Sequence, residues 1–269
     1  MKLNFWKTLL FFAAVTMTMP SVFPSSAVAD KEPEYAGAYS QDLVWENTVT
    51  MSADVLILKG ASLTVRAGTQ VNVVPAEGTK IAPEYFSSLT ELLVRGTLDI
   101  QGTPDDPVRF VIADKKETAE ISWSGITLDN ANESRVQNAE LERADIAIRC
   151  VGSSPLLKGN RITNCRYGIV AQQKSHPRIV ENILVNGEGG IFCWRDSNPY
   201  LLGNRINGHD EEAIFVDASS RPRFERNVIS GNAIGLALYP RDLQVDLVSV
   251  TENTENVRWL GQQGQGGAK

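Results

Sequence analysis

The side chains best suited to catalysis lie in the C-terminal half of the sequence. Asp196 and Asp217 are candidate catalytic carboxylates, and His209 is a candidate acid or base close to them in the chain. A pair of carboxylates on either side of a glycosidic bond is what most glycosidases need for hydrolysis. Carboxylates on neighbouring surface strands are common, however, so this set is a weak catalytic candidate.

Metal binding has two candidate donor sets. The acidic run that follows His209 consists of Asp210, Glu211 and Glu212. Carboxylate oxygens suit Ca²⁺, although a run of this kind is also typical of a solvent-exposed corner. Copper prefers Cys, Met and His. Beyond residue 29 the chain contains one Met (Met51), two widely separated His and three Cys. Direct copper binding is therefore weakly supported.

The elements that would position these side chains repeat about every 22 residues. Four segments contain Ser-x-Pro, with prolines spaced 22, 22 and 23 residues apart, at Pro155, Pro177, Pro199 and Pro222. Five residues after each proline stands an asparagine, at Asn160, Asn182, Asn204 and Asn227. A third column is aliphatic and follows a small residue, at Ile126, Ile148, Ile169, Ile191, Ile214 and Leu236. Such regularity indicates a repeat architecture.

A period of 22 residues excludes helical solenoids, whose repeats have ~33 to 47 residues. Each unit contains short alternating apolar stretches, such as residues 201–206, separated by Pro, Gly, Asn and Ser. This pattern predicts three short strands per turn in a parallel β-solenoid. Equivalent strands would stack ~4.8 Å apart. Successive turns would then share one continuous core.

The unit SxPxxxxNxI…GI resembles the right-handed parallel β-helix repeat of pectate-lyase-like and NosD-like exported proteins. The stretches 63–71 and 92–111 resemble the first turns of bacterial β-helix proteins, as does Trp123–Leu128 followed by 134–148. The resemblance covers about residues 43–238. It implies an all-β, single-stranded right-handed parallel β-helix with about 22 residues per turn. This fold carries many activities, so the resemblance does not specify one.

The repeat assigns the columns to the inside or the outside of the solenoid. The aliphatic column points inward, and the asparagines form a hydrogen-bonded ladder at one corner. Cys150 and Cys193 fall in an inward column two turns apart, ~9.6 Å, which is beyond disulfide reach. We expect these thiols to be buried, unpaired and inert. His176 falls in an exposed corner.

Outward positions carry the candidate binding residues. An aromatic cluster of Phe192, Trp194, Phe215 and Tyr239, with Arg195 beside it, falls on the outer face of one sheet. Exposed aromatic side chains stack sugar rings or anchor protein partners. The alternative is that the apolar segment 242–250 covers them.

Three functions remain compatible with this pattern. The favoured one is an exported, non-catalytic module that binds a polysaccharide or an envelope protein, with no cofactor except a possible Ca²⁺. The second is a polysaccharide-active enzyme, either a uronate lyase, a hydrolase or an epimerase, although the repeats lack the grouped Asp residues and the Gly-His-Gly of related hydrolases. The third is the role implied by the NosD-like resemblance, as an accessory protein in copper-enzyme maturation.

Composition and the N-terminus set the compartment. The net charge of −6 argues against nucleic acid binding, and three Cys cannot form a disulfide framework. Lys2 and Lys7, an apolar run and Ala27-Val28-Ala29 form a signal-peptide pattern too short to span a membrane. We therefore expect a periplasmic or extracellular protein with no membrane span in its mature chain.

The expected organisation is a signal peptide (1–29), a flexible lead-in (30–42), the β-helix with its caps (43–250) and a largely disordered tail (251–269).

Overall fold

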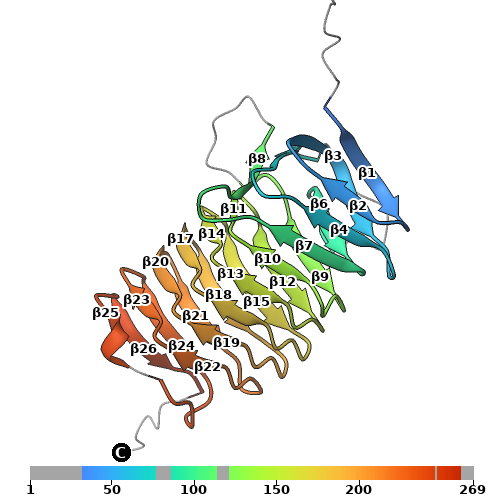
Figure 1. The fold of residues 1–269 in the computed structure, drawn as a ribbon. Coiled ribbons are helices and arrows are strands. Elements are labelled where there is room, and N and C mark those ends of the chain that lie inside the picture. Colours follow the sequence, from blue (N-terminus) through green and yellow to red (C-terminus); the bar gives the residue numbers. More distant parts are fainter. Residues whose placement is uncertain (1–31, 77–85, 114–120, 246, 262–269) are drawn as a thin grey trace, which may run out of the picture. The chain divides into compact units, whose positions relative to one another are not determined.

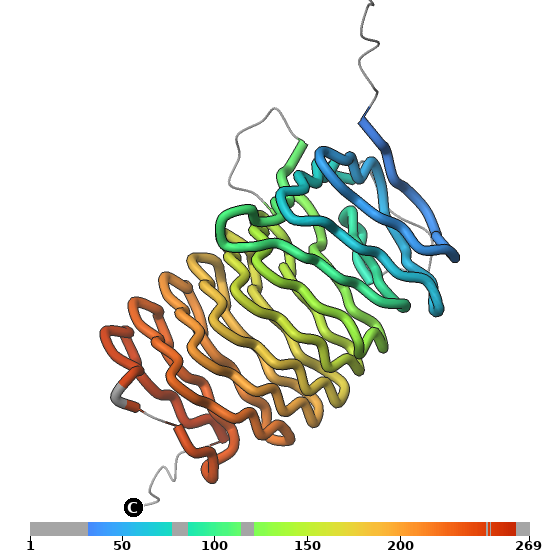
Figure 2. Tube along the Cα trace, in the orientation of Figure 1, coloured from blue at the N-terminus to red at the C-terminus, as the bar shows by residue number. Residues whose placement is uncertain are grey.

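A computed structural model describes residues 32–76, 86–113, 121–245 and 247–261. These residues form a parallel β-solenoid of about nine turns with about 22 residues per turn, as the repeat predicts. Figure 1 shows the strands of successive turns lying side by side. Figure 2 shows the chain coiling from turn to turn in the same order. The predicted signal peptide and its cleavage site lie outside the described residues.

Three faces make up the solenoid. Face 1 is an eight-stranded parallel sheet of β2 (Leu43–Trp45), β4 (Ser62–Val65), β7 (Thr97–Gln101), β10 (Arg135–Gln137), β13 (Leu156–Lys158), β16 (Arg178–Val180), β19 (Tyr200–Leu202) and β22 (Arg223–Glu225). Face 2 contains β3 (Thr48–Ile57), β5 (Gln70–Val73), β8 (Val108–Ile112), β11 (Ala139–Glu142), β14 (Arg161–Thr163), β17 (Ile183–Gly187), β20 (Arg205–His209), β23 (Val228–Ser230) and β25 (Val250–Thr251). Face 3 contains β6 (Glu91–Val94), β9 (Gly125–Asp129), β12 (Ile146–Val151), β15 (Tyr167–Gln172), β18 (Gly189–Cys193), β21 (Glu212–Val216), β24 (Ile234–Leu238) and β26 (Glu255–Trp259).

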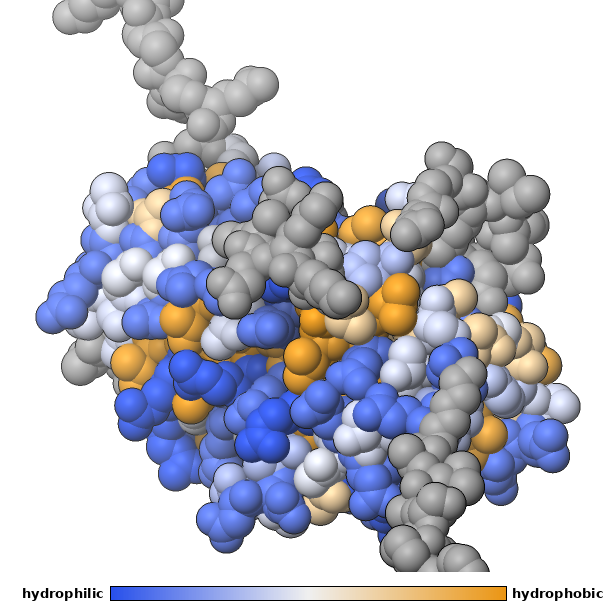
Figure 3. Space-filling view, turned by 90° about the horizontal axis from the view of Figure 1, so that it is seen from above, coloured by the Kyte–Doolittle hydropathy of each residue, from blue (hydrophilic) through white to orange (hydrophobic). Residues whose placement is uncertain are grey.

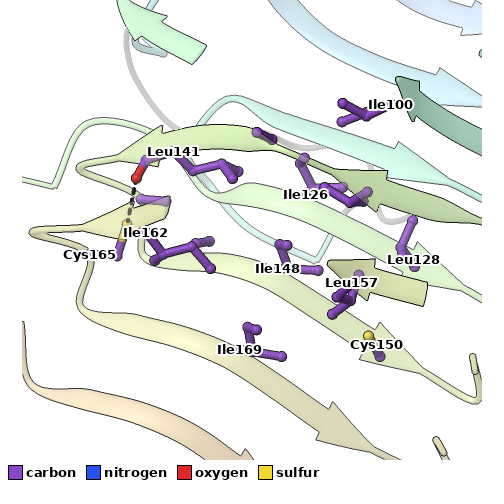
Figure 4. Packing of buried hydrophobic residues seen from close by; sticks show 14 of the residues in the cluster. Ile100, Ile126, Leu128, Leu141, Ile148, Cys150, Leu157, Ile162, Cys165 and Ile169 are labelled. Carbon is purple, nitrogen blue, oxygen red and sulfur yellow. Dashed lines mark hydrogen bonds between the residues drawn. The ribbon is translucent and has the colours of Figure 1, made fainter. Parts of the chain in front are cut away.

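The register of face 3 confirms the predicted inward column. Ile126, Ile148 and Ile169 pair in successive strands, and all three are fully buried. Figure 4 shows these side chains stacked in the interior, opposite Leu157 of face 1. Cys150 and Cys193 lie in the next inward column with Ala171 between them, and both are buried free thiols. Hydrophobic residues reach the surface seen in Figure 3 only in small groups between hydrophilic ones.

The corner between faces 1 and 2 is a buried asparagine ladder. The Nδ2 atom of Asn182 donates to Oδ1 of Asn204 (2.9 Å) and to the carbonyl of Leu157 (3.0 Å). Its own Oδ1 accepts from the backbone N–H and from Nδ2 of Asn160, both at 2.9 Å. The same contacts continue to Asn227. The asparagine column is therefore structural, as predicted.

The ends of the solenoid differ from the predicted boundaries. The expected flexible lead-in (30–42) contains β1 (Glu34–Tyr39), which pairs with β3. The expected disordered tail (251–269) contains β26, which pairs with β24. Both strands extend the solenoid because an end strand can hydrogen-bond to the turn inside it without contributing to the apolar repeat. The 3₁₀ turn η1 (Leu247–Ser249) lies beside β25. No helix among the described residues is long and apolar enough to cross a membrane.

Candidate aromatic binding face

The four predicted aromatic residues meet on the outer side of face 3. Phe192 pairs with Phe215 in the neighbouring turn, and both side chains point away from the core column of Ile191 and Ile214. We define the aromatic face as Phe192, Trp194, Phe215, Tyr239 and Tyr167, which packs edge-on against Phe192 at 4.9 Å. Tyr167 was missed from the sequence because it lies three positions before Val170, the residue of its strand that is in register with Phe192.

The rings of the aromatic face stack mainly on one another. The ring centroids of Phe192 and Phe215 lie 5.5 Å apart at an interplanar angle of 18°. Trp194 lies 5.0 Å from Phe215 with a tilt of 32°. Tyr239 meets Phe215 edge-on at 6.1 Å. This stacking covers much of the ring faces, so that solvent reaches mostly ring edges and the outermost rings.

Exposure increases from the inner to the outer members of the face. The exposed fraction is 7% for Phe192, 41% for Trp194 and 43% for Tyr239. Beside them is a hollow of about 290 Å³, which is lined by Ile146, Tyr167, Val170, Gln172, Phe192, Trp194 and Arg195. The guanidinium of Arg195 forms no ion pair with any described residue. The face therefore combines an apolar surface with one available cation.

The described apolar residues of the segment 242–250, which was expected to cover the aromatic face, pack at the end of the core instead. Leu243 and Val245 pack against the end of the core, and Val245 lies in a crevice beside Phe224 and Val250. In contrast, the outward residues Leu93 and Thr127 at the N-terminal end of face 3 are almost completely buried. Exposed aromatic side chains are thus concentrated in the C-terminal turns of this face.

Of the two candidate catalytic carboxylates, that of Asp217 is occupied by hydrogen bonds from the backbone. Asp217 accepts hydrogen bonds from the backbone N–H groups of Arg195 (2.7 Å), Ser219 (3.0 Å) and Ser220 (2.9 Å). Burial raises the pKa of Asp217, but the hydrogen bonds, led by that of Arg195, lower it by more. The net shift of the pKa is therefore downward. Asp217 is thus an ionised carboxylate that fixes a corner. Asp196 lies on the same corner, with its backbone N–H bonded to Ser219.

His209 is buried instead of lying in a solvent-exposed corner. It is 3% exposed, and neither ring nitrogen has a hydrogen-bond partner. Burial lowers its pKa to about 4. His209 ends β20 and stands in register with Gly187, while the next turn has Asn232 at this position, whose Oδ1 accepts from the N–H of His209 (3.1 Å). His209 therefore occupies the place of a corner asparagine and has no access to a substrate.

The predicted calcium donors are divided between different environments. Asp210 and Glu211 are exposed, and Glu212 begins β21 in a half-buried position. Among the described residues no group of three or more His, Cys, Asp or Glu side chains is placed to hold a metal ion. The acidic run and His209 are adjacent in sequence but do not converge.

Soft metal donors are equally scattered. Cys150, Cys165 and Cys193 are buried, and burial raises the pKa of Cys150 and Cys165 to about 12. A protonated thiol in an apolar core is a poor copper ligand, because the thiolate is the form that binds metals. Met51 is fully buried, and the exposed His176 accepts a hydrogen bond through Nδ1 from the N–H of Asn198 (3.1 Å). The described residues do not fit a copper site.

The fold and the surface define a parallel β-helix protein with an exposed aromatic face. The family model described as "Periplasmic copper-binding protein (NosD)" matches residues 90–258, which is more than half of the chain. The chain belongs to this NosD family, and it is a periplasmic protein. No curated protein and no solved structure is similar enough to the chain to match it.

Proposed function

We propose that this protein is a periplasmic accessory factor of a copper-enzyme system, and that it works by docking a protein partner on its aromatic face. Membership of the NosD family supports the setting. The observation that carries the docking role is the exposure of Trp194 and Tyr239 on a sheet whose other members are packed ring against ring. Large exposed aromatic residues are typical anchors of protein interfaces.

The ring geometry favours a protein over a glycan at this face. A sugar stacks on the open face of an aromatic ring, whereas Phe192, Trp194 and Phe215 largely cover one another's faces. Ring edges and a hollow of about 290 Å³ suit an apolar side chain of a partner, with an acidic group next to Arg195. The partner would bring the copper site, because the soft donors of this chain do not converge.

Site-specific photo-crosslinking tests the docking role in the periplasm. A photoreactive phenylalanine replaces Trp194 in one strain and Val228 in another. Val228 is a matched control because it is 47% exposed but lies on face 2. We expect one defined adduct with a protein of the copper-enzyme system from position 194 and none from position 228. Equal adducts from both positions, or none from either, would contradict the proposal.

Function is tested by complementation. A strain that lacks the protein receives the wild type, the double variant Trp194→Ala/Tyr239→Ala or Val228→Ala, and the copper content of the copper enzyme is measured. We expect the double variant to fail and Val228→Ala to succeed. The purified protein should not take up Cu(I) from a chromophoric chelator, and one tightly bound copper per chain would contradict the assignment of the copper site to the partner.

A further inference from the structure

A second surface lies on face 1, around a corner from the aromatic face, and consists of a row of arginines. In register, Arg135 pairs with Leu156, Leu156 with Arg178, Arg178 with Tyr200, and Tyr200 with Arg223. The guanidinium groups thus project outward at every second turn, with an apolar or aromatic side chain between them. We define the arginine row as Arg135, Arg178 and Arg223.

The arginine row is not neutralised within the protein. All three arginines are exposed, and none forms an ion pair with a described residue. Arg109 and Arg166, by contrast, pair with glutamates at 3.0 Å and 2.9 Å. Arg223 stacks over the ring of Tyr200 at 5.3 Å, and this contact leaves its N–H groups available. The row is therefore a line of available cations on a protein whose net charge is negative.

Two of the three arginines of the row line a hollow in the surface. A groove of about 590 Å³ contains Arg135, Leu156 and Arg178. It continues into a second hollow of about 710 Å³, with which it shares Thr97 and Glu133. The acidic residues of the groove, Asp99 and Glu133, lie at its N-terminal end. An anionic ligand would run along the groove from Arg135 to Arg178 and continue beyond the groove to Arg223, where the carboxylate of Glu225 accepts a hydrogen bond from the hydroxyl of Tyr200.

The spacing of the charges selects the type of ligand. Two strand spacings separate neighbouring arginines, which is ~9.6 Å along the solenoid. An extended peptide presents side chains on one face every ~6.6 Å, and each strand of a B-form duplex carries one phosphate per ~3.4 Å of helix axis. A polysaccharide with one carboxylate in each disaccharide repeats over two sugar rings, and each ring spans roughly one strand spacing. Leu156 and Tyr200 would lie under the uncharged rings.

We propose that the arginine row binds a linear acidic polysaccharide that carries one carboxylate per disaccharide. The carboxylates pair with Arg135, Arg178 and Arg223 through the planar donor edges of the guanidinium groups. The sugar rings between them contact Leu156 and the ring of Tyr200. This surface is separate from the aromatic face, so a partner protein and a polysaccharide can occupy the two sites together.

Binding of hyaluronate oligosaccharides, measured by calorimetry with the purified mature chain, tests the proposal. Hyaluronate carries one carboxylate per disaccharide, dextran is the neutral control, and polyglutamate is the peptide polyanion. We expect hyaluronate to bind and dextran not to bind. Polyglutamate should bind at least tenfold more weakly. Arg178→Gln should weaken hyaluronate binding about tenfold, since it removes one charge-assisted contact.

A matched control variant exists on face 2. Arg205 is also exposed and forms no ion pair with a described residue. Its register neighbours Ile183 and Val228 are apolar, but it borders neither of these hollows. Arg205→Gln should leave hyaluronate binding unchanged, and Arg135→Gln should repeat the loss seen for Arg178→Gln. The absence of hyaluronate binding, equal losses in Arg178→Gln and Arg205→Gln, or polyglutamate binding as tight as that of hyaluronate would each overturn the proposal.

Discussion

The asparagine corner and the aromatic face both stack one kind of side chain over successive turns, yet their surroundings are opposite. Asn160, Asn182 and Asn204 are buried, and their side chains are bonded above, below and to the backbone. Trp194 and Tyr239 lie at the surface, where solvent reaches them. Repetition inside the solenoid thus meets the needs of the fold. Repetition outside it has no such requirement, and we propose that it serves binding.

Removal of one asparagine from the ladder should have the largest effect on stability. Asn182→Ala should lower the free energy of unfolding by about 4 kcal/mol, because it leaves the carbonyl of Leu157 and the N–H of Asn160 buried without partners. Urea denaturation measures the change. Asn207→Ala, at an exposed position of β20, is the control and should change stability by less than about 0.5 kcal/mol. Similar losses in both variants would show that burial does not distinguish the ladder.

The buried His209 adds a pH dependence to the stability of another corner, the one between faces 2 and 3. Its pKa falls to about 4 in the folded protein, so the unfolded chain binds the proton more tightly. Stability should therefore decrease as the pH falls from about 6.5 to about 4, by at most about 3 kcal/mol. Urea denaturation of the wild type and of His209→Asn over this range isolates the effect. Parallel curves for the two proteins would exclude His209 as its source.

Within the aromatic face, inner and outer rings should behave differently. Phe192→Ala removes a ring with 7% exposure and should cost about 2 kcal/mol, somewhat less than in a closed core. Trp194→Ala removes a ring with 41% exposure and should cost less than about 1 kcal/mol while it impairs complementation of the copper enzyme. Thermal unfolding and complementation, measured together, separate the two roles. A large loss of stability in Trp194→Ala would assign this residue to the fold.

The smallest expected effect concerns the carboxylate next to that face. Asp217→Ala removes an acceptor for the N–H groups of Arg195, Ser219 and Ser220, and it should cost about 1 kcal/mol because the corner is partly open to solvent. Urea denaturation measures the loss. Turnover of any polysaccharide by the wild type that disappears in Asp217→Ala would instead restore a catalytic role.

Much of the fold follows from the sequence because the repeat itself is the structural signal. The spacing of Pro177, Asn182 and Ile191 predicted a corner, a ladder and an inward column, and each is present. The ends were wrong, since β1 and β26 join the sheet by backbone hydrogen bonds, which leave no trace in the apolar pattern. Local sequence also suggested that His209 lies at the surface, because acidic residues come directly after it. The hydrogen bond from its N–H to Asn232 of the next turn shows that His209 belongs to a buried corner column.

The sequence by itself determined the solenoid, the identity of its inward columns and the group of aromatic residues on one face. These features depend on the alternation of apolar and polar residues along a strand and on the recurrence of the same residue types in each turn. Both can be read directly from the sequence. Only the tertiary structure decided which outward side chains are exposed, because residues far apart in the chain cover or leave them. The same holds for the arginine row. An arginine of the row is available to a ligand only if no carboxylate of another turn lies close enough to pair with it. The distance between side chains of different turns cannot be read from the local sequence.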